Sequence, residues 1–491
     1  MKKYLIQVLV LFLVFTSCEK QEDNYVPENL QVNNFIWKGL NLYYLWQADE
    51  PDLADNRFGN QTELNNFLTG YSNPDDLFQH LLNKPISQFP EGEAIDRFSV
   101  IFSDFSQLEG ILSGTTLNNG MDYGLKYKNG DNGVVFGWVR YILPNSDAVA
   151  KNVTRGMLFY AVNGVELYND KHNAENPLNN IDELLGKNTT YTINLADYDN
   201  GNITPNGQSI TLTKSVLSEN PVYLTKVIES GNKKIGYLIY NGFYSQYESQ
   251  LNAAFDQLKS QGVTDLVLDL RYNSGGSIAT AGRLASMITG QFNGQIFGKQ
   301  QWNAKAQAYF NQNNPSELID LFPSTIGNGQ AINSLNMNKV YVLTSKSTAS
   351  ASELVINGLE PYINVVQIGD ITVGKNVGSI TLYDSPTFSK KDINSKHKYA
   401  MQPLVLKITN KNNFGDYING LQPDELITEN YGNLGVLGET TEPLLNAAIT
   451  KITTGGRINQ PQNKEFKDFK NSKSLNEIGT DMYLEKVPFI K

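Results

Sequence analysis

The sequence has few of the residues that identify common classes of enzyme. Its 491 residues contain a single cysteine, Cys18, and three histidines, His80, His172 and His397. With no second cysteine there can be no disulfide within the chain. The H-E-x-x-H, G-x-S-x-G, G-x-G-x-x-G and P-loop lysine patterns are all absent. Zinc-protease, α/β-hydrolase and nucleotide-binding signatures are therefore missing, and we expect no metal and no other cofactor.

Positive charge is also scarce. Charged residues make up 18% of the chain, and the net charge is −10. Nucleic-acid binding requires a basic face, so we do not expect a nucleic-acid partner. Hydrophobic residues make up 40% of the chain, which is enough for sizeable cores, and the length predicts more than one domain.

The N-terminus has the pattern of a targeting segment. Lys2 and Lys3 precede an apolar run over residues 4–15, which is too short for a usual membrane-spanning helix. A lone cysteine at position 18 resembles the lipidated residue of bacterial lipoproteins. We predict a signal peptide over residues 1–17, lipidation of Cys18, and an exported protein anchored in the bacterial envelope, facing the periplasm or the surface. The alternative is an ordinary secretory signal followed by an unused thiol.

The rest of the chain changes pattern several times. After a polar tether over residues 18–31, aromatic and aliphatic residues at helical spacing predict a small helical region. Strand and turn signals follow, then alternating strands and helices, in which residues 291–337 form a long polar insertion. The tail is polar, and we expect it to be loosely held. The predicted boundaries are 32–102 for the helical region, 103–217 for the strand-rich domain, 218–455 for the core and 456–491 for the tail.

The most informative stretch covers residues 340–379. An apolar run at 340–343 predicts a strand, a hydroxyl-rich turn follows, and residues 353–359 predict a short helix. A serine at a strand-to-helix turn can present its hydroxyl, and the free N–H groups of the helix can bind an oxyanion. Lys375, in a turn among small and apolar residues, could lose its proton by burial and act as a base. The alternative is that the serines cap a helix and Lys375 lies on the surface.

A second stretch combines an apolar run with a glycine turn. Residues 264–270 form a near-continuous apolar run that predicts a buried parallel strand. The turn R-Y-N-S-G-G follows, and residues 277–288 predict a helix. Glycine here would let the backbone approach a substrate closely.

These two stretches together resemble the C-terminal processing peptidases, also called tail-specific proteases. The resemblance is carried by the run S-T-A-S-A-S-E-L-V, by a G-K pair whose lysine lies 25 residues after the second serine of that run, and by D-L-R-x-N-x-G-G over residues 269–276. It implies that Ser350 is the nucleophile and Lys375 the general base. It also implies an oxyanion hole formed by the N–H of Ala351 and that of Gly275 or Gly276.

One position departs from the pattern of that family. Many members carry glutamine or glutamate four residues after the lysine, where it orients the amine. This chain has Ser379 there, which could hydrogen-bond the amine in its place.

Part of the strand-rich region is similar to a PDZ domain. The sequence from Arg155 ends in an Asn163-Gly164 hairpin turn, and Met157 stands where PDZ domains usually have an aspartate. The resemblance implies a groove that binds an extended peptide by strand addition. Tyr123, Gly124 and Leu125 would form its carboxylate-binding loop. The alternative is a PDZ-shaped domain that only packs against the core.

The predicted fold is therefore a mixed α+β and α/β multidomain protein. It has a ClpP- or crotonase-like peptidase core, a PDZ-like β domain and a small N-terminal helical region. The predicted function is a serine endopeptidase that cleaves exported proteins or peptides, recognising their C-terminal tails, through a Ser350–Lys375 dyad. One alternative is a catalytically inactive peptide-binding lipoprotein of the same fold. Another, acyl-CoA chemistry, rests only on the crotonase likeness. Polypeptides are the expected partners, and the oligomeric state stays open.

Overall fold

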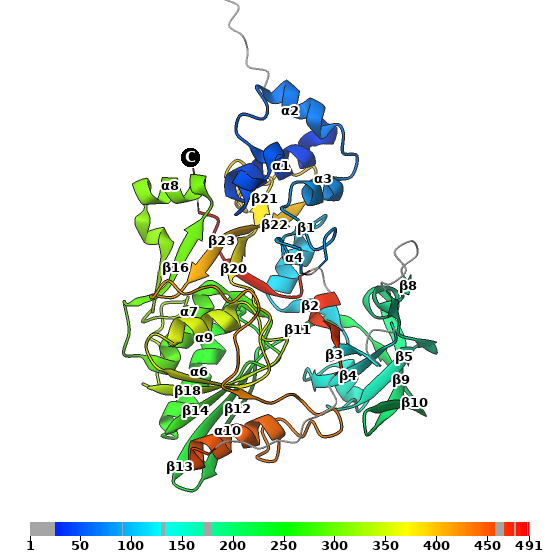
Figure 1. Cartoon of the computed structure of the whole chain (residues 1–491), viewed down its shortest axis with the longest axis vertical. Helices are drawn as coiled ribbons and strands as arrows, with labels where there is room; N and C mark the ends of the chain where they lie inside the picture. Colours follow the sequence, from blue (N-terminus) through cyan, green and yellow to red (C-terminus); the bar gives the residue numbers. More distant parts are fainter. Residues whose placement is uncertain are drawn as a thin grey trace, which may run out of the picture.

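The computed structural model describes residues 25–90, 92–128, 133–170, 178–456, 466–475, 478–488 and 490. The predicted signal peptide, Cys18 and His172 lie outside these residues. Within them, no helix combines the length and the apolar character needed to cross a bilayer. Figure 1 shows a helical part at the top, a β-rich part at one side and an α/β core below.

The N-terminal part is helical, as predicted. Its apolar residues are buried between the helices and against the core, Phe35, Ile36 and Leu40 among them. Asn60 and Asn73 cap the second and third helices by accepting hydrogen bonds from backbone N–H groups. The helices are η1 (Glu28–Leu30), α1 (Gln31–Tyr43), η2 (Gln47–Asp49), η3 (Pro51–Leu53), α2 (Gln61–Leu68) and α3 (Pro74–His80).

The β-rich part is built on one antiparallel sheet with the strand order β10-β9-β5-β4-β3-β25, in which β25 (Asp468–Asn471) comes from the C-terminal tail. The predicted Asn-Gly turn joins β5 and β6, and both residues have the positive φ that a tight hairpin turn requires, 54° at Asn163 and 77° at Gly164. The elements are β2 (Thr115–Asn118), β3 (Met121–Tyr127), β4 (Val135–Ile142), α5 (Asp147–Ala150), β5 (Leu158–Val162), β6 (Val165–Glu166), β7 (Asn169–Asp170), β8 (Leu178–Asn179), η4 (Asp182–Lys187), β9 (Thr190–Asp199), β10 (Asn202–Thr213) and β11 (Ser215–Ser218).

The core is a three-layer structure. Its sheet has the order β12-β13-β14-β18-β19-β24, and it is parallel from β13 onward. Helices α6, α7 and α9 pack on one face and α10 on the other. Burial on both faces explains why β14 was an almost continuous apolar run. The elements are β12 (Val222–Ser230), β13 (Lys233–Tyr240), η5 (Ser245–Tyr247), α6 (Glu248–Ser260), β14 (Asp265–Asp269), α7 (Ile278–Thr289), β18 (Lys339–Thr344), α9 (Ala351–Leu359), β19 (Asn364–Gly369), β24 (Glu425–Leu426) and α10 (Pro443–Thr454).

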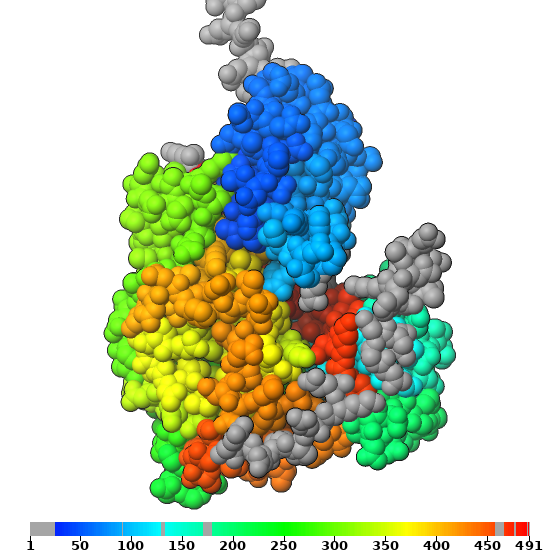
Figure 2. Space-filling view, in the orientation of Figure 1, coloured from blue at the N-terminus to red at the C-terminus, as the bar shows by residue number. Residues whose placement is uncertain are grey.

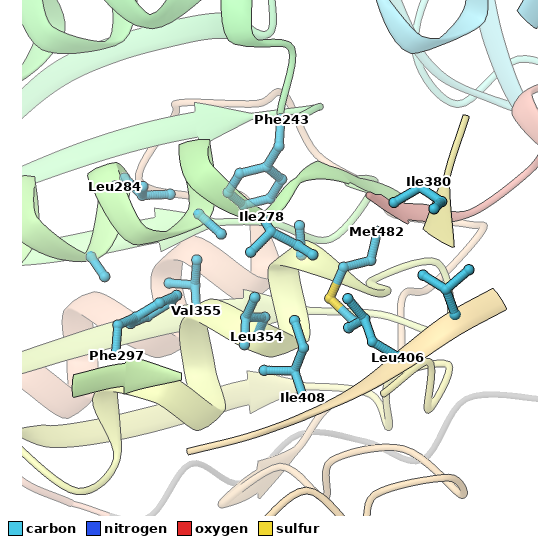
Figure 3. Close-up of a cluster of buried hydrophobic side chains, with 14 of the residues drawn as sticks. Phe243, Ile278, Leu284, Phe297, Leu354, Val355, Ile380, Leu406, Ile408 and Met482 are labelled. Atoms are coloured by element: carbon cyan, nitrogen blue, oxygen red, sulfur yellow. The ribbon is translucent and has the colours of Figure 1, made fainter. Parts of the chain in front are cut away.

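A second sheet lies beside the first, in the order β15-β26-β20-β23-β16-β17. The insertion over residues 291–337 contributes β16, α8 and β17 and buries Phe297 and Trp302, so it is a folded part of the core. Figure 3 shows the packing of this second sheet against helices α7 and α9, with Met482 of β26 among Ile278, Ile380 and Leu406. The elements are β1 (Val100–Phe102), α4 (Phe105–Leu112), β15 (Gly275–Ser277), β16 (Ile296–Trp302), α8 (Ala304–Asn313), η6 (Pro315–Leu318), β17 (Ile319–Leu321), β20 (Val377–Ile380), β21 (Leu382–Tyr383), β22 (Ala400–Gln402) and β23 (Leu404–Thr409).

The described residues of the tail, 466–475 and 478–488, are called the C-terminal segment below. They contain β25 (Asp468–Asn471), η7 (Lys473–Leu475) and β26 (Asp481–Leu484). β25 pairs with β3 in the β-rich part, and β26 lies between β15 and β20 in the core. The prediction of a loosely held tail is wrong for these residues, because backbone pairing and the burial of Phe466, Ile478 and Met482 hold them. The segment is red in Figure 1, and in Figure 2 it fills the hollow between the three parts.

Candidate active site

The glycine turn follows directly from the end of β14. Arg271 is buried there, and its guanidinium forms ion pairs with Asp269 at 2.8 Å and with Glu442 at 2.6 Å. These pairs hold the turn against the N-terminus of α10. Asn273 shapes the next residues, because its side chain donates to Tyr240 O at 2.8 Å and accepts from Gly275 N–H at 2.9 Å. The turn is therefore fixed from both sides.

Gly275 brings the turn into contact with the predicted nucleophile. Its φ is 112°, a conformation that favours glycine. A Cβ at this position would lie 2.6 Å from the Cβ of Ser350 and 2.2 Å from Asp481 O. Only glycine fits here, so the close approach between the turn and Ser350 depends on this residue.

Ser350 occupies the sharp turn between β18 and α9. It is fully buried and is the N-cap residue of α9, with a φ of 65°. Such a conformation costs a non-glycine residue about 1–3 kcal/mol and is typical of functional sites. Its hydroxyl has no hydrogen-bond partner among the described residues. Ala351 is the first helical residue, and its N–H is one of the free donors of the helix N-terminus.

A buried carboxylate, that of Glu353, connects the two turns predicted to carry the chemistry. It accepts hydrogen bonds from the backbone N–H of Ser350 at 2.6 Å, Gly374 at 2.6 Å and Lys375 at 2.9 Å. The hydroxyl of Thr372 also donates to it. Burial raises the pKa of Glu353, and these hydrogen bonds act in the opposite direction. Through this one side chain the serine turn and the lysine turn are held together.

Lys375 is buried as the base hypothesis requires, with 1% of its surface exposed. Its ammonium lies 4.7 Å from the centre of the Phe98 ring. The Nζ atom donates to Thr480 O at 2.8 Å and lies 3.5 Å from Asp481 Oδ1. Burial lowers the pKa of Lys375, and the Asp481 carboxylate opposes that shift.

Ser379 lies in the same pocket but contacts a different group from the one we expected. Its hydroxyl donates to Asp481 Oδ1 at 2.8 Å. Gln402 donates to Ser379 Oγ at 3.0 Å and to Asp481 Oδ2 at 3.1 Å. Ser379 and Gln402 thus hold Asp481, and Asp481 reaches the lysine.

The structure brings most of the predicted site residues to one place, but not all of them. Ser350, Ala351, Gly275, Gly276, Lys375 and Ser379 gather around the turns just described. Tyr123, Gly124 and Leu125 lie on strand β3 rather than in a loop, and β25 covers the edge of that strand. Their role in peptide binding stays a prediction.

Three polar residues at this site carried no functional assignment from the sequence. Glu353 stands inside the serine motif, so its position could have suggested a role. Gln402 and Asp481 come from distant, unremarkable stretches, and only the tertiary structure places them here. In the described part of the chain, no group of three or more His, Cys, Asp or Glu side chains is arranged to hold a metal ion.

Two protein-family models match parts of this chain. The model described as peptidase family S41 matches residues 234–388, which include both turns. The model of the S41 N-terminal domain matches residues 31–100. The chain therefore contains a peptidase S41 domain, preceded by an S41 N-terminal domain. The S41 domain therefore contains Ser350, Lys375 and the glycine turn.

Relatives and solved structures support the same family. A carboxyl-terminal-processing protease of Picosynechococcus is 23% identical over 254 residues, 52% of this chain and 53% of that protein. The carboxy-terminal processing protease CtpA of Bacillus subtilis is 25% identical over 264 residues, 51% of this chain and 50% of that protein. The matches thus span about half the length of these relatives. An S41 protease of Bacteroides fragilis superposes with a TM-score of 0.62 at 26% identity, covering 88% of this chain and 98% of that one. The photosystem II D1 C-terminal processing protease shares the fold, with a TM-score of 0.50 at 18% identity over 86% of this chain and all of that one.

Proposed function

We propose that this S41 protein is a serine endopeptidase that cleaves polypeptides through Ser350 and Lys375. The observation that carries the proposal is the shared Glu353 carboxylate, which binds the backbone of both residues. It holds a strained serine with an unpartnered hydroxyl and a buried lysine in adjacent turns, beside a glycine turn that admits a substrate backbone.

The chemistry follows from these positions. Neutral Lys375 removes the proton from the Ser350 hydroxyl as its oxygen attacks the scissile carbonyl. The N–H of Ala351 and an N–H of the glycine turn donate to the oxyanion of the tetrahedral intermediate. The lysine then gives its proton to the leaving amine, and an acyl-enzyme remains. Water attacks the acyl-enzyme by the same route, and Ser350 is released.

The β-rich part supplies a route for recognition of the substrate. We propose that the edge of β3, with Tyr123, Gly124 and Leu125, accepts an extended peptide as an added strand and presents its tail to the core. The support is that this edge does pair with an added strand, β25, in the structure. Relatives named for carboxyl-terminal processing favour C-terminal tails as substrates. Export and lipidation at Cys18 belong to the same proposal.

A second candidate is a peptide-binding lipoprotein without turnover. The observation that favours it is the Asp481 carboxylate 3.5 Å from Lys375 Nζ. An adjacent negative charge favours the ammonium form of lysine, which cannot accept a proton.

The test is cleavage of casein by the chain from Glu19 onward, beside the variants Ser350→Ala and Lys375→Ala. We expect slow cleavage by the wild type and a loss of about 10⁴-fold or more in each variant. Circular dichroism checks that both variants are folded. Cleavage by Lys375→Ala at the wild-type rate would reject the proposed base, and equal cleavage by Ser350→Ala would reject the nucleophile.

A further inference from the structure

The C-terminal segment occupies both places where a substrate would bind. Its first part, β25, lies antiparallel to β3, with Lys470 opposite Leu125 and Asn471 opposite Gly124. Its side chains also reach their neighbours, because Lys470 Nζ lies 3.4 Å from Asp182 Oδ1 in η4. The segment therefore lies along the edge of β3 and beside η4, where an added peptide strand would lie.

The second part of the segment lies against the catalytic residues. β26 is parallel to both β15 and β20, with Asp481 opposite Gly275 and Tyr483 opposite Ser379. Thr480 O accepts a hydrogen bond from Lys375 Nζ at 2.8 Å. Backbone of the segment thus runs directly past the glycine turn and the lysine, along the path that a scissile peptide would take.

The side chain of Asp481 opposes the proposed chemistry. It faces the Lys375 ammonium at 3.5 Å and is held there by Ser379 and Gln402. Burying a charge pair costs desolvation, and an apolar side chain would pack in such a place at similar or lower cost. A strand with a purely structural role has no need of a carboxylate at this position, whereas a strand that keeps the lysine charged does.

The structure has open space beside the C-terminal segment. A cavity borders the segment on the side of α4 and β2, and it is lined by Leu112 and Thr116, by the glycine turn and by Gly479, Thr480 and Asp481. Figure 2 shows the red segment in the hollow that the three parts of the molecule enclose. The segment therefore borders open space at Gly479 and Thr480.

We propose that the C-terminal segment is an autoinhibitory strand, which occupies the peptide groove and the catalytic cleft together until a substrate polypeptide displaces it. This inference rests on the proposed peptidase function. It identifies the occupant of the cleft as this chain's own segment, with Asp481 as the residue whose carboxylate faces Lys375 Nζ.

A reversible crosslink tests the proposal in the full-length mature chain. The chain from Glu19 onward contains no cysteine, so a single introduced pair is unambiguous. Lys126 and Asp468 are directly opposed partners and form an ion pair at 2.9 Å, which makes Lys126→Cys with Asp468→Cys a suitable pair. We expect the oxidised form to cleave casein about tenfold or more slowly than the reduced form of the same protein. Wild type, treated with oxidant and reductant in the same way, is the control. Equal rates in the two forms would overturn the proposal.

A point variant gives an independent result. Asp481→Asn removes the charge facing Lys375, and we expect it to cleave several times faster than the wild type. Glu485→Gln is the matched control, since Glu485 lies in the same segment but accepts from Ser277 at 2.8 Å. Slower cleavage by Asp481→Asn would make this residue part of the catalytic machinery and would contradict inhibition. Cleavage of the chain within its own segment, seen by mass spectrometry, would make the segment a substrate and contradict it as well.

A binding measurement separates this inference from the proposed function. In the Ser350→Ala background, a fluorescent peptide with the sequence of residues 467–484 reports access to the groove and cleft without turnover. We expect it to bind the reduced crosslink variant and to bind the oxidised form at least tenfold more weakly. That result without any casein cleavage would reject the peptidase and keep the displaceable strand. Casein cleavage with no response of either assay to oxidation would support the peptidase and reject the displaceable strand.

Discussion

Two regions of the chain meet at the active site and differ in almost every other respect. Residues 339–380 carry apolar runs, a serine-rich turn and a glycine-lysine pair, and they fold into β18, α9, β19 and β20. The C-terminal segment has no such pattern, yet its Asp481 and Thr480 contact the same lysine. The proposed nucleophile and base are thus encoded within one short stretch of sequence. The residues that occupy the site are brought there by pairing between positions more than one hundred apart.

The largest effect on the first region is expected from crowding Ser350 through the neighbouring glycine turn. Gly275→Ala places a Cβ within 2.6 Å of the Ser350 Cβ, so the nucleophile or the turn must move. We expect casein cleavage to fall about 10³-fold, the cost typical of losing an oxyanion donor. The control is Gly262→Ala, a glycine whose φ is also positive, 68°, but which has open space around its Cβ. A loss of activity as large in Gly262→Ala would show that backbone strain alone, and not the contact with Ser350, is responsible.

Glu353→Gln tests whether the two turns depend on their shared carboxylate. The amide cannot accept all the hydrogen bonds that reach the two carboxylate oxygens. We expect about 100-fold lower activity from displaced catalytic groups, and about 1–3 kcal/mol lower stability in urea unfolding. The control is Glu439→Gln, an exposed residue that pairs with Lys226. Full activity in Glu353→Gln would mean that each turn is positioned by its own contacts.

The pH dependence of kcat/KM measures how the C-terminal segment affects the pKa of Lys375. Lysine acts as a base only when neutral, so kcat/KM should rise with pH through the lowered pKa of Lys375. The Asp481 and Asp96 charges raise that pKa and Arg97 lowers it. Removing the Asp481 charge therefore lowers the pKa further, and Asp481→Asn should shift the rising limb of the pH profile to lower pH. The profile of Glu485→Gln should not move. A shift of the Asp481→Asn limb to higher pH would show that the carboxylate does not face the ionising lysine.

The smallest effect is expected at Ser379. Its hydroxyl binds Asp481 rather than the lysine amine, so Ser379→Ala loosens the segment and leaves the catalytic residues in place. We expect cleavage about threefold faster, the size of one lost hydrogen bond. The matched variant is Thr381→Ala. Thr381 follows Ser379 closely in the chain, and its hydroxyl donates to Gln402 Oε1. A large loss of activity in Ser379→Ala would instead return this serine to the lysine-orienting role.

Features that depend on residues close together in the sequence could be predicted, and features that depend on distant residues could not. The strands at β13, β14, β18 and β19 and helix α6 were predictable because their periodicity reflects burial on known faces. Ser350, Lys375 and the glycine turn could be singled out because their motifs are short and their spacing is fixed.

Other features could not be predicted because their causes are distant in the sequence. Asp481 carries no motif, and its backbone pairing with Gly275 joins positions about 200 residues apart. The insertion at 291–337 had the same difficulty, since the buried Phe297 lies against Gly282 of α7 and Gly358 of α9, on either side of it in the sequence. Tyr123, Gly124 and Leu125 were expected in a loop, but β25 extends the sheet along their strand.

The covalent connection between the C-terminal segment and the core has a quantitative consequence. A strand attached to the same chain competes at an effective concentration that is of the order of millimolar for a short flexible linker. A free peptide with equal affinity would need a comparable concentration to take its place. A protein substrate that engages the groove on β3 and the cleft beside Gly275 at once gains the same advantage of attachment. The proposed peptidase would therefore cleave long substrates that occupy both places in preference to short peptides that fit only one of them.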